Sequence, residues 1–279
     1  MHLVTAASDT ISTFEAIILG IVQGLTEFLP ISSTAHLRIV PAFAGWDDPG
    51  SAFTAIVQLG TMAAVLLYFR HDLWNMTKAL LHTFTGDRPL WRTKDVDGKL
   101  GWYIVLGTIP IVILGFAFKS VIEDQLRTLE LIATVMILFS LVLYLADTRG
   151  ARDREVGSLK LSDGIKIGFA QALALVPGVS RSGATISAGL LLGLTREAAT
   201  RYSFLLSVPA VVLSGLFELR KVSTGDVPVG PTIAAFIFGY LTIAWLLRYI
   251  RTHNFAIFVA YRVLLGLIVL VLAATNTIT

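Results

Sequence analysis

The chain has 279 residues, of which 55% are hydrophobic and 15% are charged, and its mean hydropathy is +0.75. This balance is far from that of a soluble domain and predicts a protein of the lipid bilayer. The absence of cysteine excludes disulfides, thiolate metal sites and cysteine nucleophiles. The net charge of +3 is small, and the basic residues lie mainly in short connecting segments, so no nucleic-acid partner is expected.

Six stretches of the sequence are apolar and close to the length of a transmembrane helix. They cover residues 52–70, 102–119, 129–146, 201–217, 230–249 and 255–275. Each should be helical, because lipid offers no hydrogen-bond partner to an open backbone. The predicted fold class is an all-α polytopic membrane protein in which residues 1–279 form a single membrane domain.

Two further segments, 14–45 and 163–196, are apolar but interrupted. The first contains PISSTAH and the second contains VPGVSRSGAT. Non-helical backbone at membrane depth is tolerated only where it is buried in protein or lines a polar cavity. The sequence therefore predicts two re-entrant helical hairpins whose interrupted tips face an internal site.

The two interrupted segments are similar to each other. GIVQGLTEFLPISST, from Gly20, matches GFAQALALVPGVSRS, from Gly168, through Gly, Gln, a Pro shifted by one position and a Ser cluster. We therefore predict two repeats, about 12–146 and about 163–275. An odd number of membrane crossings in each repeat gives them opposite orientations.

The distribution of charge predicts the orientation in the membrane. Segments 70–101, 147–166 and 248–254 would share one face, and together they carry thirteen Lys or Arg. The opposite face, counted over 119–128 and 218–229, carries four. Because cytoplasmic loops are enriched in basic residues, the first face should be cytoplasmic and both termini should lie outside.

Two polar residues precede the first interruption. Gln23 and Glu27 are four residues apart and share one helical face, which ends at Pro30. A carboxylate inside an apolar segment is costly unless it lines a wet cavity, binds a cation or meets a positive partner such as Arg181. The alternative is a structural Glu27 that is bonded to the broken backbone.

The start of the next predicted helix can bind anions. Ser32, Ser33 and Thr34 offer capping hydroxyls, and free N–H groups at a helix start favour phosphate. His36 lies within about one turn and can transfer protons. Ser32 fits an ordinary capping role equally well.

The second interruption has the composition of a phosphate cradle. Gly178 and Gly183 allow close backbone approach, and Arg181 supplies a permanently charged, forked donor. Hydroxyl donors follow at Ser180, Ser182 and Thr185. The alternative is a static ion pair of Arg181 with Glu27. The other membrane arginines, Arg38, Arg201 and Arg262, are interpreted as snorkelling or locally paired, without a role.

These segments resemble a known family. QGLTEFLPISSTAH and PGVSRSGAT are similar to the paired signature motifs of the undecaprenyl-diphosphate phosphatases linked to bacitracin resistance. The resemblance covers nearly the whole chain, including FTAIVQLGTMAAV and AIFVAYR. It implies hydrolysis of a polyprenyl diphosphate in the bacterial plasma membrane, dependence on a divalent cation (Mg²⁺ or Ca²⁺), and an active site open to the outer face.

The resemblance also implies roles for individual residues. The catalytic residues would be Glu27, Ser33, His36 and Arg181, and the diphosphate would bind Ser180, Arg181 and Thr185. The hydroxyls of Thr34 and Ser182, which the residue types alone suggest, are added to the predicted diphosphate ligands. The metal ligands would be Glu27 and Gln23. Many members of the family carry Glu at the position of Gln23, so Glu27 would contribute more of the metal binding here.

Two questions remain open at this level. His36 could activate Ser33 as a nucleophile or could activate water directly. A transporter or flippase of an anionic lipid is the competing function, because inverted repeats with broken helices also build transporters. The expected partners are the lipid substrate and the bilayer, with a homodimer as a further option.

Overall fold

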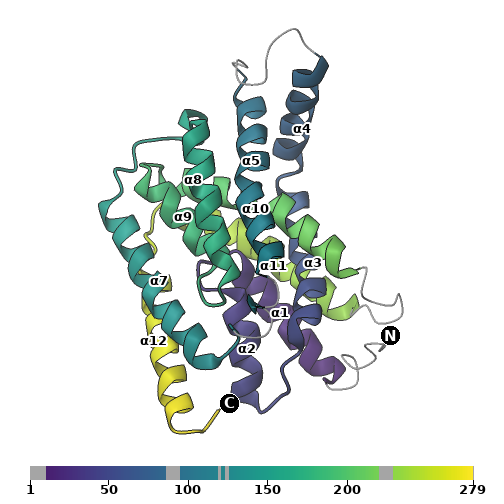
Figure 1. The fold of residues 1–279 in the computed structure, drawn as a ribbon, viewed down its shortest axis with the longest axis vertical. Helices are drawn as coiled ribbons and strands as arrows, with labels where there is room; N and C mark the ends of the chain where they lie inside the picture. The colour runs from purple at the N-terminus through teal and green to yellow at the C-terminus, as the bar shows by residue number, and fades with distance from the viewer. Residues whose placement is uncertain (1–10, 86–94, 119–120, 123–125, 220–228, 279) are drawn as a thin grey trace.

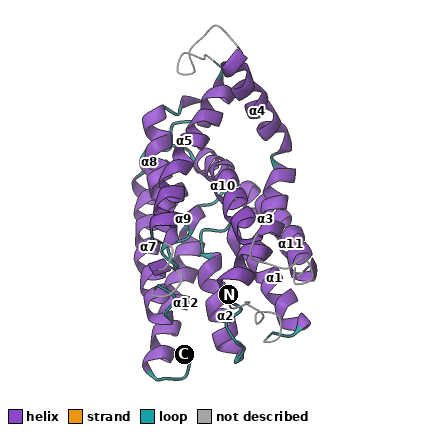
Figure 2. Cartoon of the chain, turned by 45° about the vertical axis from the view of Figure 1, so that its right-hand side comes forward, coloured by secondary structure: helices purple, strands orange, loops and turns teal. Residues whose placement is uncertain are grey.

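The computed structural model describes residues 11–85, 95–118, 121–122, 126–219 and 229–278, and every extended element of regular structure in these residues is helical (Figures 1 and 2). The α-helices are α1 (Thr13–Glu27), α2 (Ser33–Ala44), α3 (Gly50–Tyr68), α4 (Arg70–Thr85), α5 (Val96–Ala117), α7 (Leu129–Arg149), α8 (Leu161–Ala172), α9 (Arg181–Leu191), α10 (Arg196–Leu219), α11 (Val229–Tyr249) and α12 (Ala256–Ala274).

Several helices are long and apolar enough to cross a membrane. Within the described residues these are α5, α7, α11 and α12, and a fifth span results if α3 and α4 are counted as one bent span. The prediction of an all-α polytopic membrane protein is therefore confirmed at this level.

The end of the span expected at 52–70 differs from the prediction. The chain bends by 78° after α3 and continues as α4, which the sequence reading assigned to a connecting segment. The sequence analysis did not predict this helix because its composition is polar. It packs against α5 and buries Met76. Asp72 in its first turn pairs with Arg201 of α10, so Arg201 is locally paired, as expected.

Two pairs of helices approach each other very closely. A Cβ atom added to Gly20 of α1 would lie 2.3 Å from the carbonyl oxygen of Pro231 in α11. A Cβ atom added to Gly168 of α8 would lie 2.3 Å from the carbonyl oxygen of Gly107 in α5. Each glycine therefore brings its helix into backbone contact with a helix from the other part of the chain.

The two interrupted segments meet inside the molecule. We call residues 28–32, between α1 and α2, the first break, and residues 173–180, between α8 and α9, the second break. In Figure 1, α1 and α2 lie in the lower part of the molecule and α8 and α9 in the upper part. Ser182 Oγ, at the start of α9, donates to the Leu29 carbonyl oxygen at 2.9 Å, which places the two breaks side by side.

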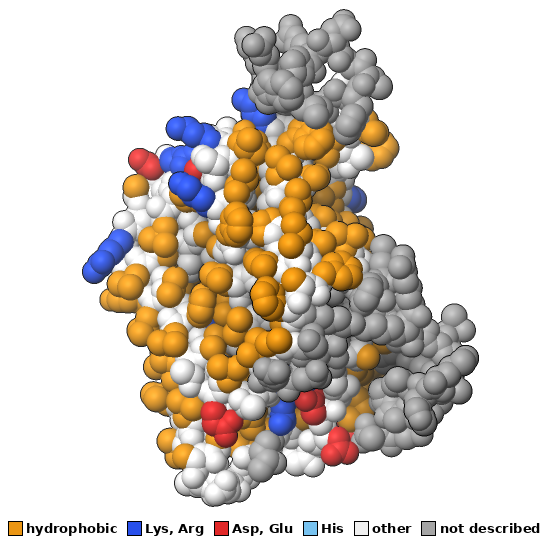
Figure 3. Space-filling model, viewed as in Figure 1, with side chains coloured by type: hydrophobic (Ala, Val, Ile, Leu, Met, Phe, Trp, Pro, Cys, Tyr) orange, Lys and Arg blue, Asp and Glu red, His pale blue; other side chains and the backbone are white. Residues whose placement is uncertain are grey.

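The surface separates apolar and charged regions. Figure 3 shows a broad band of hydrophobic side chains, with Lys and Arg gathered above it and Asp and Glu mainly below it. Lys119, Arg220, Lys221 and the first ten residues, which bear on the predicted orientation, lie outside the described residues.

Candidate active site

The Glu27 carboxylate, at the end of α1, accepts four hydrogen bonds from four helices. Its Oε2 accepts from Gln23 Nε2 at 2.9 Å and from Ser33 Oγ at 2.6 Å. Its Oε1 accepts from Gln58 Nε2 at 3.0 Å and from Arg181. Since the carboxylate side chain is only 6% exposed, these donors supply the stabilisation that water would otherwise give.

Ser33 is the first residue of α2 and directs its hydroxyl toward Glu27. The preceding residue, Ser32, has φ 73° and stands at the N-cap position, but its side chain accepts no bond from the helix backbone. Ser32 Oγ instead lies 3.2 Å from the Thr34 hydroxyl. The ordinary capping role considered for Ser32 is therefore wrong, and the first amides of α2 keep no side-chain cap.

His36 is buried and held at both ring nitrogens. Nδ1 lies 2.8 Å from the Ser32 carbonyl oxygen, which can only accept, so Nδ1 carries a proton. Nε2 lies 2.7 Å from the hydroxyl of Tyr261 in α12, whose ring stacks on the imidazole. The described contacts of His36 thus lead to Tyr261, and the hydroxyl of Ser33 contacts Glu27 instead.

The second break brings Arg181 to the carboxylate. Arg181 begins α9, pairs with Glu27 and keeps 16% of its side chain exposed. Ser180 has φ 73°, and its Oγ accepts from the Gly183 amide at 3.1 Å and lies 3.2 Å from Ser182 Oγ. The second break therefore holds Arg181 at the partly exposed edge of the site, whereas the hydroxyls of Ser180 and Ser182 are buried.

Thr185 lies apart from the exposed edge of the site. Its side chain is 1% exposed. Its hydroxyl lies 2.6 Å from Ser203 Oγ in α10 and donates to the Arg181 carbonyl oxygen at 2.8 Å. The structure thus directs Thr185 toward the packing of α9 on α10, whereas Thr34 of α2 is exposed.

The sequence analysis missed Gln58 and Tyr261 as members of this cluster. Gln58 is the one amide side chain in the mostly apolar α3, and this was the available signal. Tyr261 gave no such signal, because a tyrosine in a membrane helix is often an interfacial residue.

The side chains around Glu27 offer oxygen atoms that could hold a divalent cation. The Gln23 side chain is 1% exposed, and its Oε1 has no hydrogen-bond partner among the described atoms. Glu27, Gln23 and Ser33 thus offer carboxylate, amide and hydroxyl oxygens. No group of three or more His, Cys, Asp and Glu side chains suited to a metal occurs in the described part of the chain. Mg²⁺ is commonly bound by one or two carboxylates plus substrate phosphates, which matches this sparse set.

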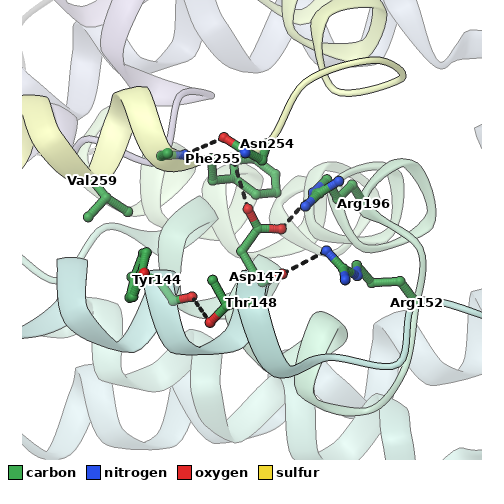
Figure 4. A pocket seen from close by; sticks show the side chains of 9 residues that line it. Tyr144, Asp147, Thr148, Arg152, Arg196, Asn254, Phe255 and Val259 are labelled. Atoms are coloured by element: carbon green, nitrogen blue, oxygen red, sulfur yellow. Dashed lines mark hydrogen bonds and ion pairs between the residues drawn. The ribbon is translucent and has the colours of Figure 1, made fainter.

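A cavity of about 280 Å³ lies elsewhere, between α7, α10 and the start of α12 (Figure 4). Asp147 at its centre accepts from Arg196 Nε at 2.6 Å and from the Phe255 amide at 2.9 Å. Arg152 donates to the Asp147 carbonyl oxygen at 2.9 Å. These hydrogen bonds join α7, α10 and the start of α12, which is a structural role. We therefore take the cluster at Glu27 as the candidate active site.

Comparison with known proteins identifies the family. The family model described as bacitracin resistance protein BacA matches residues 16–268. The chain belongs to the BacA family. The described hydrogen-bond partners of Glu27, namely Gln23, Ser33, Gln58 and Arg181, all lie within the matched region.

Individual relatives are similar along nearly their whole length. A Nocardioides sp. protein named undecaprenyl-diphosphatase is 54% identical, with 95% of this chain and 97% of the relative covered. An Arthrobacter sp. protein of the same name is 50% identical, with 98% of each chain covered. Undecaprenyl-diphosphatase 3 of Frankia alni is 52% identical, with coverage of 95% and 96%. This BacA family member therefore spans nearly the whole length of these relatives.

Proposed function

We propose that the chain hydrolyses undecaprenyl diphosphate to undecaprenyl phosphate and inorganic phosphate. The activity would recycle the lipid carrier for cell-wall polymer synthesis and confer bacitracin resistance. The observation that carries this proposal is the meeting of Glu27, Ser33 and Arg181 where the two breaks adjoin. Membership of the BacA family and the names of the relatives support the same activity.

Arg181 and the start of α2 would bind the diphosphate. A guanidinium group forms forked, charge-assisted hydrogen bonds with phosphoryl oxygens. The uncapped amides at the start of α2 and the positive end of its dipole favour the same anion. Phosphoryl transfer is accelerated mainly by such positioning and charge neutralisation.

Glu27 would act as the general base. In the proposed reaction, Ser33 Oγ attacks the terminal phosphorus while its proton passes to Glu27 Oε2, 2.6 Å away. The bond from this phosphorus to the bridging oxygen breaks and leaves the lipid monophosphate, and water then releases phosphate from the serine. In the alternative, Glu27 activates water directly. Trapping of a phosphoserine at Ser33 would support the first route, and its absence from an active enzyme would support the second.

A divalent cation would be held by Glu27 and Gln23 together with the substrate. When bound, it would neutralise charge on the diphosphate. In Gln23→Glu, a second carboxylate should strengthen metal binding, so isothermal titration of Mg²⁺ and the Mg²⁺ dependence of phosphate release should both show a lower midpoint than in wild type. An unchanged or raised midpoint in both measurements would argue against a metal at this position.

We further propose six spanning helices and two re-entrant hairpins in inverted repeats, about residues 12–146 and 163–275. The pairing of helices supports this arrangement, because α1 packs on α11 as α8 packs on α5. Gly20 and Gly168, which are matched in the repeat alignment, make equivalent close contacts. Ser32 and Ser180, also matched, share the same φ of 73°.

The proposed orientation places both termini and the active site at the outer face of the plasma membrane. Because the natural chain has no cysteine, single cysteines report accessibility cleanly. An impermeant maleimide should label Asp47→Cys, in the loop after α2, on intact cells and should leave Asp153→Cys, after α7, unlabelled. The reverse pattern would reverse the orientation.

The activity is tested with purified protein and undecaprenyl diphosphate. We expect phosphate release that depends on metal, is blocked by EDTA, and is lost in Glu27→Ala and Arg181→Ala. Arg154→Ala, remote from the breaks, serves as the matched control and should stay active. Absence of release from folded wild type with added metal would favour the transporter, which assays of lipid movement in vesicles would then test.

A further inference from the structure

Arg262 of α12 is completely buried, with an exposed fraction of 0%. Its guanidinium group makes no ion pair among the described residues and donates only to backbone carbonyl oxygens. Nη1 donates to Pro30 at 3.0 Å and Val179 at 3.3 Å, Nη2 to Gly178 at 2.8 Å and Val179 at 3.2 Å, and Nε to Met136 at 3.3 Å. One side chain therefore contacts the first break, the second break and α7.

The carbonyl groups at the breaks need such a donor. At Pro30 and Gly178 the chain is not helical, so their carbonyl oxygens lack the usual donor four residues later. An unpaired carbonyl buried at membrane depth is costly, and so is an unpaired buried cation. The contact between Arg262 and the breaks offsets both costs at once.

The geometry requires arginine rather than another cation. Arginine presents five N–H donors in a planar fork, whereas lysine carries three donors on one nitrogen atom. Arg262 uses all three of its nitrogen atoms to reach four carbonyl groups. A single ammonium group cannot occupy these separated positions.

The start of α9 is packed directly against this guanidinium group. A Cβ atom added to Gly183 would lie 3.1 Å from Arg262 Nη1, closer than ordinary contact. Gly183 lies two residues after Arg181, and its amide is the one bonded to Ser180 Oγ. The absence of a side chain at Gly183 thus allows the fork to reach the second break.

We propose that Arg262 is a positioning residue that sets the two breaks against each other. Through Pro30 it fixes the start of α2, where Ser33 stands, and through Gly178 and Val179 it fixes the start of α9, where Arg181 stands. Arg262 itself has no exposed surface with which to touch a substrate. The positioning role is independent of the proposed function, and only the expected change in kcat rests on it.

The test compares Arg262→Lys with Arg154→Lys in purified protein. Arg154 is the matched control because it also donates to carbonyl groups of two segments, those of Leu192 and Ser158, away from the breaks. Hydrogen–deuterium exchange, followed by mass spectrometry, measures how well the backbone amides at the two breaks are protected, independently of activity. Steady-state phosphate release from undecaprenyl diphosphate reads the consequence for the reaction.

In Arg262→Lys we expect faster exchange in peptides covering both breaks at once, with exchange in α5 and α11 unchanged. We expect kcat to fall about a hundredfold, as a displacement of about 1 Å can cause, with a smaller change in KM. Arg154→Lys should leave both breaks and kcat unchanged. Wild-type exchange at either break, or faster exchange throughout the protein, would overturn the positioning role. If Arg262→Lys shows faster exchange at both breaks but the wild-type protein releases no phosphate, the positioning role is supported and the phosphatase is rejected.

Discussion

The hydroxyl oxygen of Ser33 lies 2.6 Å from Oε2 of Glu27, although the first break separates the two residues. The break folds the end of α1 back onto the start of α2, so the carboxylate and the hydroxyl face each other. A continuous helix through residues 27–33 would place them almost two turns apart.

Glu27→Gln should therefore remove most of the phosphatase activity. The amide retains the shape of the side chain but is a much weaker proton acceptor, and general-base catalysis contributes about 10²- to 10⁴-fold. We expect kcat to fall by that range in a phosphate-release assay. Glu15→Gln, in the exposed capping box of α1, is the matched control and should retain wild-type kcat. A Glu27→Gln enzyme with normal kcat would rule out this base.

Gln58→Leu tests the donor that the sequence analysis missed. It removes the 3.0 Å hydrogen bond to Glu27 Oε1, and a bond to a charged group contributes about 1.5–3 kcal/mol. We expect kcat/KM to fall about ten- to a hundredfold.

Gln171→Leu is the matched control for Gln58→Leu. Gln171 is a fully buried amide, whereas Gln58 is half-buried, and neither side-chain polar atom of Gln171 has a partner among the described residues. Its replacement should leave kcat/KM unchanged and should not lower the melting temperature. Equal losses of activity in the two variants would indicate a general packing effect.

Tyr261→Phe tests the support of His36. The substitution removes the hydroxyl 2.7 Å from Nε2 and keeps the stacked ring. A typical buried hydrogen bond contributes about 0.5–1.5 kcal/mol, so we expect the free energy of unfolding to fall by about that amount. In ¹⁵N spectra of the His36 side chain, the Nε2 resonance should move while Nδ1 stays protonated through Ser32. Movement of neither resonance would contradict this arrangement.

Gly20→Ala and Gly168→Ala should both destabilise the protein. In each variant the new methyl group would lie 2.3 Å from a carbonyl oxygen of the facing helix, and overpacking costs about 1–3 kcal/mol or more. Thermal unfolding in detergent should show a lower midpoint for both. In Gly115→Ala the nearest atom is at 3.5 Å, so that variant should melt at or above the wild-type temperature.

Much of the site could be predicted from the sequence, because charges inside apolar segments are rare and costly. Glu27 and Arg181 were singled out for that reason, Ser33 was singled out by the hydroxyl cluster and the family resemblance, and the structure brings the three together. The activating partner of Ser33 could not be predicted, since it depends on how sharply the first break turns. The bend between α3 and α4 was missed because packing on α5, rather than composition, stabilises α4.

The role of Arg262 was the least accessible to sequence reasoning. Interpretation as a snorkelling or locally paired arginine assumes water or an acidic side chain as the partner. Its partners are instead backbone carbonyl groups, which every residue possesses and no sequence pattern marks. Only the path of the chain at the two breaks shows where those carbonyl groups lie.

The pair formed by Glu27 and Arg181 also has a consequence for biosynthesis. The two residues are 154 positions apart, so at about 5–20 residues per second the ribosome completes the arginine roughly 8–31 s after the glutamate. Of the four donors that contact Glu27 in the folded structure, Gln23, Ser33 and Gln58 are all synthesised well before Arg181. The first half of the nascent chain therefore supplies three of the four donors, and the cationic partner is synthesised last.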